Sequence, residues 1–288
     1  MQPAAAHGLC IACLLADGAA RAWRLRILVG ALGGSVSLLD ALWANLVEDA
    51  AASLTPMRLG GLPARAVMLR RAGVGTGTIV VASVAESVLT YPVLITIAVA
   101  LALAFAPDWW RVIAPRMVRS SVSVGGWLVL ALILGVVTWL VMRQFLPHVH
   151  SSARLKLALA GSELRRAGVA PLAWSLALTV TSTAARLAVL PMLTRTVTSP
   201  PPLGVVALSS FALLYGQLLL PVPSGAGAVE LGFLAGGAGV GAGAARRLLL
   251  AWRLYTALIA IGAGLLVVVV HTAHSLTGRG RSGEEDHA

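Results

Sequence analysis

Long stretches of this chain lack Asp, Glu, Lys and Arg altogether, namely residues 87–107, 120–142, 167–185 and 254–278. A helix needs roughly 20 apolar residues to cross the hydrocarbon core of a bilayer, where backbone N–H and C=O groups must bond within the segment. Residues 27–47 form another candidate span if Asp40 is tolerated, and residues 203–220 form an apolar run between prolines. The sequence therefore predicts about six to eight membrane segments.

The composition excludes an ordinary soluble domain. Only 11% of the residues are charged and 58% are hydrophobic, whereas a soluble domain carries about 25% charged residues. We predict an all-α, polytopic integral membrane helical bundle, multi-pass in the cell membrane. A single transmembrane domain is expected over residues 1–275, followed by a polar C-terminal tail at 276–288.

The net charge of +11 comes from short basic clusters at the ends of the apolar segments. Such a distribution is typical of the positive-inside bias and of contact with anionic lipid headgroups. We therefore expect membrane lipids rather than nucleic acid as partners. The clusters are Arg21, Arg24 and Arg26; Arg65, Arg70 and Arg71; Arg154, Lys156, Arg165 and Arg166; Arg246 and Arg247.

Two Gly/Pro-rich stretches resemble each other, TPMRLGGLPARAVMLRRAGVGTG at 55–77 and LPVPSGAGAVELGFLAGGAGVGAG at 220–243. Pro56 matches Pro221 at an offset of 165 residues, and a long apolar segment follows each copy. Internal repeats built on broken hydrophobic segments point to a transporter substrate site, because broken helices leave backbone groups free to bind a ligand. Re-entrant segments are one form that such broken elements take. The alternative is that both stretches are only kinked helices or interfacial turns.

Several charged residues lie within or beside apolar segments, where an ionised group costs at least about 2.5 kcal/mol unless it is paired or hydrated. Arginine can satisfy a carboxylate or a phosphate there through two parallel hydrogen bonds. We take Arg58, Arg65, Glu86 and Glu230 as candidates for ligand binding, with structural ion pairing as the alternative. Asp40, Arg186 and Arg253 are interpreted as structural charges, and Glu48 and Asp49 lie at the edge of an apolar segment.

The run SGAGAVE at 224–230 is suited to open a half-helix, whose N-terminal N–H groups and partial positive charge favour a phosphate. Ser224, Gly225, Gly227 and Glu230 are therefore included in the candidate lipid site. In the alternative interpretation, Glu230 only complements the helix dipole.

No catalytic constellation is recognisable in the sequence. Cys10-x-x-Cys13 lacks the further ligands of a zinc site and the context of a redox motif. His148-x-His150 and His271-x-x-His274 have no carboxylate at ligand spacing, and no G-x-x-x-x-G-K-[ST] loop is present. We expect no metal, no cofactor and no enzymatic activity.

The pattern T-P-x-x-x-G-G…R-A-x-x-L-R-R-x-G, followed by L-P-x-P-x-G-x-G-x-x-E, resembles the membrane domain of lysylphosphatidylglycerol synthases and their stand-alone flippase-like relatives. The first motif comprises Thr55-Pro56, Gly60-Gly61, Arg65-Ala66, Leu69-Arg70-Arg71 and Gly73; the second comprises Leu220-Pro221, Pro223, Gly225, Gly227 and Glu230. The similarity extends over roughly residues 20–272.

The resemblance implies a role in moving an anionic or glycosylated lipid between leaflets. Two departures bear on it. Relatives often carry Glu shortly after the first Gly-Gly, where this chain has Leu62-Pro63, and Ser224 stands where Gly is usual. The missing carboxylate puts ion coupling at that position in doubt.

We therefore predict a lipid flippase or transporter that translocates or binds an anionic or glycosylated lipid, with a phosphate-bearing headgroup. The alternative is a non-catalytic membrane subunit that scaffolds or regulates an envelope glycosyltransferase or another lipid-modifying enzyme. We also expect Arg65 and Glu230, at equivalent repeat positions, to approach each other or share one ligand.

Overall fold

A computed structural model describes residues 2–55, 58–119, 162, 168–198, 200–216, 233 and 240–282. All regular structure in these residues is helical, which confirms the prediction of an all-α membrane bundle. The helices are α1 (Pro3–Ala31), α2 (Leu38–Leu54), α3 (Gly61–Arg71), α4 (Thr76–Arg119), α6 (Val169–Thr194), α7 (Leu203–Tyr215) and α9 (Ala242–Arg253), followed by a π-helical turn η3 (Leu254–Leu258) and α10 (Ile259–Ser282).

Four helical stretches in the described part of the chain are long and apolar enough to cross a membrane: Pro3–Ala31, Thr76–Asp108, Val169–Thr194 and Gly243–Ala273. The expected spans 87–107 and 167–185 fall within two of them, and 254–278 overlaps a third. Residues 120–142 and most of the repeat element 220–243 lie outside the described residues.

The prediction of one span over residues 27–47 is wrong, because a turn divides this stretch into two helices. Gly33 adopts φ +77°, a conformation that glycine accepts without steric cost. Ser37 then caps α2: its hydroxyl oxygen accepts a hydrogen bond from the Asp40 backbone N–H at 3.0 Å. Residues 3–31 form the first span instead, including the stretch around Asp17.

The first Gly/Pro-rich stretch is broken, as predicted. α2 ends at Leu54, and the hydroxyl oxygen of Thr55 accepts a hydrogen bond from the backbone N–H of Gly60 at 2.8 Å. A Cβ on Gly61 would lie 3.0 Å from Cβ of Ala52 and 3.2 Å from the carbonyl oxygen of Glu48. The Thr and Gly-Gly positions of the motif thus allow α3 to pack closely on α2.

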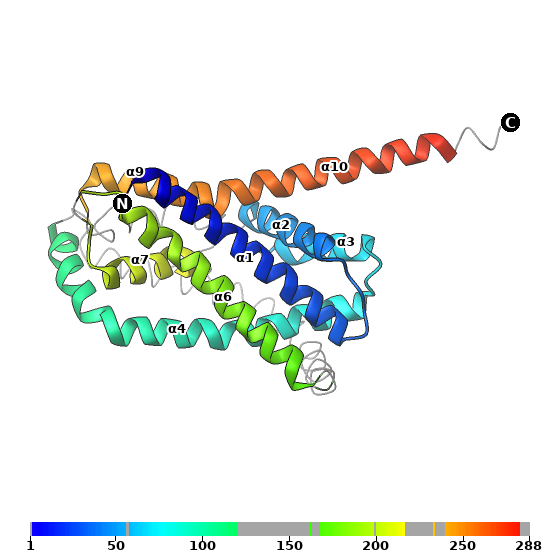
Figure 1. The fold of residues 1–288 in the computed structure, drawn as a ribbon, viewed down its shortest axis with the longest axis horizontal. Helices are drawn as coiled ribbons and strands as arrows, with labels where there is room; N and C mark the ends of the chain where they lie inside the picture. Colours follow the sequence, from blue (N-terminus) through cyan, green and yellow to red (C-terminus); the bar gives the residue numbers. More distant parts are fainter. Residues whose placement is uncertain are drawn as a thin grey trace, which may run out of the picture.

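Two apolar clusters form the described core. One joins α1, α2, α3 and the start of α4 through residues such as Leu25, Leu69 and Ile79, and the other joins α6, α7 and α9 around Leu190 and Trp252. α1 packs most extensively against α6 and runs antiparallel to it, while α10 packs on α2 and then projects beyond the bundle (Figure 1).

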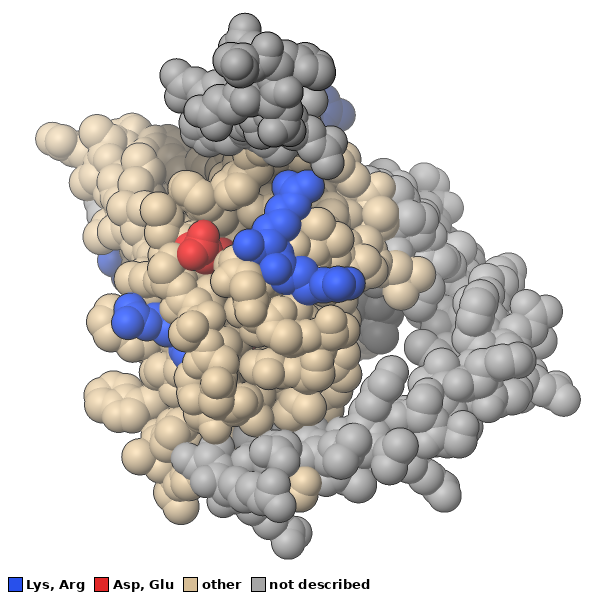
Figure 2. Space-filling model, turned by 90° about the vertical axis from the view of Figure 1, so that its right-hand side faces the viewer, with Lys and Arg blue, Asp and Glu red and all other residues tan. Residues whose placement is uncertain are grey.

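The outer surface is largely apolar. Large hydrophobic side chains are exposed along α4 and α10, among them Ile95, Leu103, Leu266 and Val269. On the end of the molecule drawn in Figure 2, most of the described surface is uncharged and a few basic side chains lie near an acidic one. Such a surface suits contact with lipid chains.

Candidate functional site

Three charged side chains of α1 point inward on one helical face. Asp17, Arg21 and Arg24 are spaced by four and three residues, so they lie along a single stripe of the helix. Asp17 and Arg24 are buried. The stripe faces α6: the hydroxyl of Ser182 donates to Asp17 at 2.5 Å, and Arg24 donates to the hydroxyl oxygen of Thr179 at 2.8 Å.

Glu86 on α4 is the centre of the first group of ion pairs. One carboxylate oxygen pairs with Arg24 of α1, and the other lies 2.5 Å from Nη2 of Arg65 on α3. Arg65 also pairs with Glu48 of α2 at 3.2 Å. Glu86 and its partners therefore connect four helices through ion pairs inside an apolar bundle.

Asp49 on α2 is the centre of the second group. It pairs with Arg21 of α1, with Arg58 from the α2–α3 connection at 3.4 Å and with Arg186 of α6 at 3.4 Å. Nε of Arg186 also donates to Asp17 at 2.8 Å. Arg58 has φ 58°, a left-handed conformation that costs a non-glycine residue roughly 1–2 kcal/mol.

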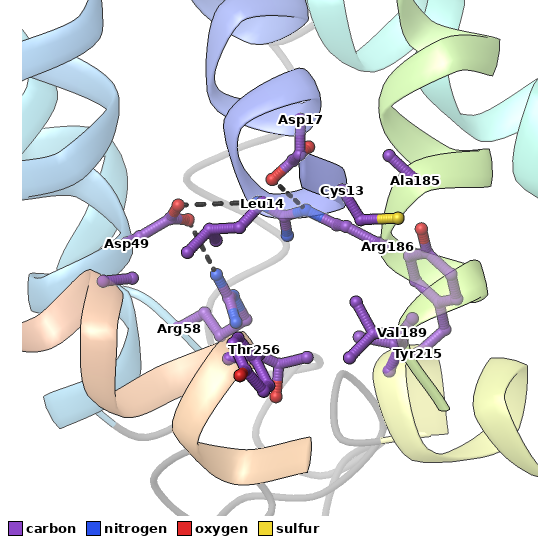
Figure 3. A pocket seen from close by; sticks show the side chains of 13 residues that line it. Cys13, Leu14, Asp17, Asp49, Arg58, Ala185, Arg186, Val189, Tyr215 and Thr256 are labelled. Carbon is purple, nitrogen blue, oxygen red and sulfur yellow. Dashed lines mark hydrogen bonds and ion pairs between the residues drawn. The ribbon is translucent and has the colours of Figure 1, made fainter. Parts of the chain in front are cut away.

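These charges surround two adjacent cavities. The larger, cavity A, has a volume of about 340 Å³ and is lined by Arg21, Arg24, Arg58, Arg65 and Arg186, by the carboxylates Glu48, Asp49 and Glu86, and by hydroxyl groups of α4 and α6. The smaller, cavity B, of about 150 Å³, is lined by Cys13, Asp17, Tyr255 and Thr256 among others. Asp49, Arg58, Arg186 and Tyr215 line both. Figure 3 shows Asp49, Arg58 and Arg186 facing one another across cavity B.

Cavity A is suited to hold an anion. Five arginines from α1, the α2–α3 connection, α3 and α6 reach it, against three carboxylates among the described lining residues. The buried Nε atoms of Arg24 and Arg65 have no hydrogen-bond partner in the described part of the chain. Guanidinium groups bind phosphate oxygens through paired N–H donors, and in a low-dielectric site such bonds are strong.

The structure brings Arg58, Arg65 and Glu86, three of the residues predicted for ligand binding, to cavity A. Arg186, interpreted from sequence as a structural charge, both pairs with carboxylates and lines the two cavities. Asp40 lies away from them at the start of α2, bonded to Ser37, and the guanidinium of Arg253 lies 5.3 Å from the ring centroid of Trp252.

The second half of the predicted site, Ser224, Gly225, Gly227 and Glu230, lies outside the described residues. The expected approach of Arg65 to Glu230 therefore stays a prediction, while the partners that the structure gives Arg65 are Glu48 and Glu86.

Sequence reasoning missed the α1 stripe. From sequence, Arg24 and Arg65 are predicted to lie in basic clusters at segment ends, facing headgroups at the membrane surface, and this is wrong because both are buried inside the bundle. The spacing D-x-x-x-R-x-x-R of residues 17–24 within an apolar helix was the signal that could have identified this stripe. Glu48 and Asp49 were noted at the edge of a span but not assigned to the site.

Residues 3–264 match the model of a protein family described as the lysylphosphatidylglycerol synthase TM region. The chain belongs to this family. As a member of the lysylphosphatidylglycerol synthase TM family, it is a membrane protein related to lipid modification or transport. Comparison with curated proteins and with solved structures finds no match in either group.

Proposed function

We propose that this member of the lysylphosphatidylglycerol synthase TM family binds a phosphate-bearing anionic lipid in cavity A and moves it between the leaflets of the cell membrane. The observation that carries the proposal is the convergence of five arginines on one polar cavity within an apolar bundle. The five arginines outnumber the three carboxylates of the described lining, so the cavity has an excess of positive charge that an anionic ligand would neutralise inside the membrane.

The walls of cavity A also suit an amphiphile. Leu62 and Leu94 line it beside the charged groups, together with the exposed ring of Tyr91. An anionic headgroup among the arginines can therefore have its chains directed toward the apolar outer surface of α4. We further propose that the lipid is bound or moved without chemical change.

Transport of fluorescent lipids in liposomes tests this proposal. In phosphatidylcholine vesicles, we expect the reconstituted protein to move fluorescent phosphatidylglycerol faster than fluorescent phosphatidylcholine, measured by quenching of the outer leaflet. Arg58→Gln removes a cavity arginine and should slow phosphatidylglycerol movement by about tenfold, which corresponds to one charge-assisted hydrogen bond.

Arg111→Gln is the matched control, because this arginine is exposed on α4 and pairs with Asp108. It should move phosphatidylglycerol at the wild-type rate. Equal movement of the two lipids, or an unchanged rate in Arg58→Gln, would contradict the proposal.

The alternative function is a non-transporting subunit of an envelope enzyme. The mutual pairing of the cavity charges favours it, since Asp17, Glu48, Asp49 and Glu86 all have arginine partners. Under this alternative, folded Arg58→Gln protein retains full function in cells, and neither fluorescent lipid is moved.

A further inference from the structure

Asp49, Arg58, Arg186 and Tyr215 line both cavities, so these four side chains lie where cavities A and B adjoin. Asp49 accepts from Arg58 through one carboxylate oxygen and from Arg21 and Arg186 through the other. Arg58 belongs to the α2–α3 connection and Arg186 to α6, so the two ion pairs join different elements through side chains that line both cavities. Figure 3 shows these side chains around cavity B.

The three arginines do not hold Asp49 equally. Arg21 makes the closest contact, and its side chain is well buried, whereas Arg58 and Arg186 both lie at 3.4 Å with side chains 25% and 29% exposed. Arg186 stays attached to Asp17 through Nε, so its Nη2 is free to exchange without loss of that bond. Arg58 has Asp49 as its one carboxylate partner among the described residues.

A carboxylate and a phosphate compete for the same guanidinium donors, because both present oxygens at matching separation to the planar fork. An anion in cavity A therefore competes with Asp49 for Arg58 and Arg186, which line that cavity too. Arg21, which makes the closest contact, can keep Asp49 paired when the other two arginines bind the anion.

We infer that Asp49 is an internal counter-anion, and that its ion pairs with Arg58 and Arg186 form a gate between cavities A and B which a phosphate-bearing ligand opens by displacement. The inference rests on the proposed function for the identity of the ligand. Asp49 is thus a specificity-determining residue, since only a ligand with an anionic group can replace it as the hydrogen-bond acceptor of Arg58 and Arg186.

Cys13 provides a native reporter of the gate, because it lines cavity B and not cavity A. Cys10, the other cysteine of the chain, is buried against the carbonyl of Val189. A Cys10→Ala background therefore leaves Cys13 as the single thiol. The experiment measures the rate at which a small neutral methanethiosulfonate reagent labels Cys13 in detergent-solubilised protein, so that the reagent itself does not compete with Asp49.

Arg58→Gly should raise this rate by about fivefold, the population shift that follows from loss of one partly exposed ion pair. Glycine is chosen because the left-handed φ of Arg58 suits it, so the α2–α3 connection keeps its conformation. The control is Arg111→Ala, because glycine at this position would weaken helix α4. Arg111 belongs to an exposed ion pair, so the labelling rate should stay unchanged.

The ligand arm uses short-chain phosphatidylglycerol as the probe, with short-chain phosphatidylcholine and inorganic phosphate as comparisons. Phosphatidylglycerol should accelerate Cys13 labelling in the Arg58-containing protein and have little further effect in Arg58→Gly. An equal effect of inorganic phosphate at the same concentration would support displacement and contradict a lipid as the occupant.

The outcomes separate the gate from the proposed function. Unchanged Cys13 labelling in folded Arg58→Gly protein would overturn the gate, even if phosphatidylglycerol binds. Faster labelling in Arg58→Gly without any binding of phosphatidylglycerol would support the gate and overturn the lipid ligand. Asp49→Asn is the second variant, and it too should accelerate labelling, since a neutral amide holds the two arginines less strongly.

Discussion

Glu86 and Asp49 are both carboxylates that hold several arginines, yet their surroundings differ. The partners of Glu86 are Arg24 and Arg65, whose side chains are 7% and 3% exposed, while two of the partners of Asp49 are 25% and 29% exposed. A buried ion pair cannot lose one member without leaving an uncompensated charge, whereas a partly hydrated pair can. The comparison therefore distinguishes a structural centre from an exchangeable one.

The largest effect is expected from Glu86→Ala, which leaves Arg24 and Arg65 without their shared carboxylate. Removal of one partner of a buried pair costs about 3–5 kcal/mol. Thermal unfolding in detergent should show a large loss of stability, while Asp108→Ala, at an exposed pair on the same helix, should have no measurable effect. Equal stability of the two variants would mean that Glu86 is not structural.

A smaller loss is expected when α3 is pushed away from α2. Gly61→Val introduces branched carbon atoms where even a Cβ lies 3.0 Å from Ala52, and such overpacking costs about 1–3 kcal/mol. Since α3 carries Arg65, binding of short-chain phosphatidylglycerol should weaken together with stability.

The matched control for this displacement is Gly77→Val, at the start of α4. A Cβ on Gly77 has no neighbouring atom within 4 Å. We expect the unfolding temperature of this variant to stay close to that of the wild type. A loss as large as that of Gly61→Val would show that packing against α2 is not the cause.

Asp49→Asn should destabilise the protein by about 1–2 kcal/mol, less than Glu86→Ala, because hydrated arginines tolerate loss of the negative charge better. In contrast, its affinity for short-chain phosphatidylglycerol should rise, since Arg58 and Arg186 lose their competing carboxylate. Isothermal titration of the purified variant measures the affinity, and a decrease would mean that Asp49 helps to bind the lipid.

The smallest change in stability is expected for Arg58→Gly. The ion pair to Asp49 contributes at most about 1 kcal/mol at this exposure, and relief of the left-handed φ offsets much of it. Chemical denaturation should therefore place Arg58→Gly within about 1 kcal/mol of the wild type. A loss comparable to that of Glu86→Ala would remove the distinction between the two centres.

Much of the fold follows from the sequence, because apolar length alone decides which segments can cross a membrane. Residues 87–107 and 167–185 were recognised in this way. The first helices differ from the predicted span over residues 27–47, because Asp40 follows Ser37 in a helix cap after the turn at Gly33. Glycine followed by a Ser N-cap was a local signal of the turn.

The candidate site was only partly predictable. The position of Glu86 within an apolar segment indicates that it belongs to the site. The Gly-Gly motif indicates the same for the neighbouring Arg58 and Arg65. Which arginine binds which carboxylate depends on how α1 and α6 pack, and no pattern within one segment contains that information. The two partners of Arg186, Asp17 on α1 and Asp49 on α2, are examples, because nothing in its own segment indicates them.

The length of α4 sets a further condition on the surrounding lipid. Its apolar span, Thr76–Asp108, has 33 residues and extends about 50 Å along the helix path, longer than the roughly 30 Å thickness of a hydrocarbon core. Figure 1 shows α4 bending near its C-terminal end. Hydrophobic mismatch of this size must be met by tilt or by a thicker bilayer. We therefore expect the position of Glu86 relative to the membrane midplane to vary with the acyl-chain length of the host membrane.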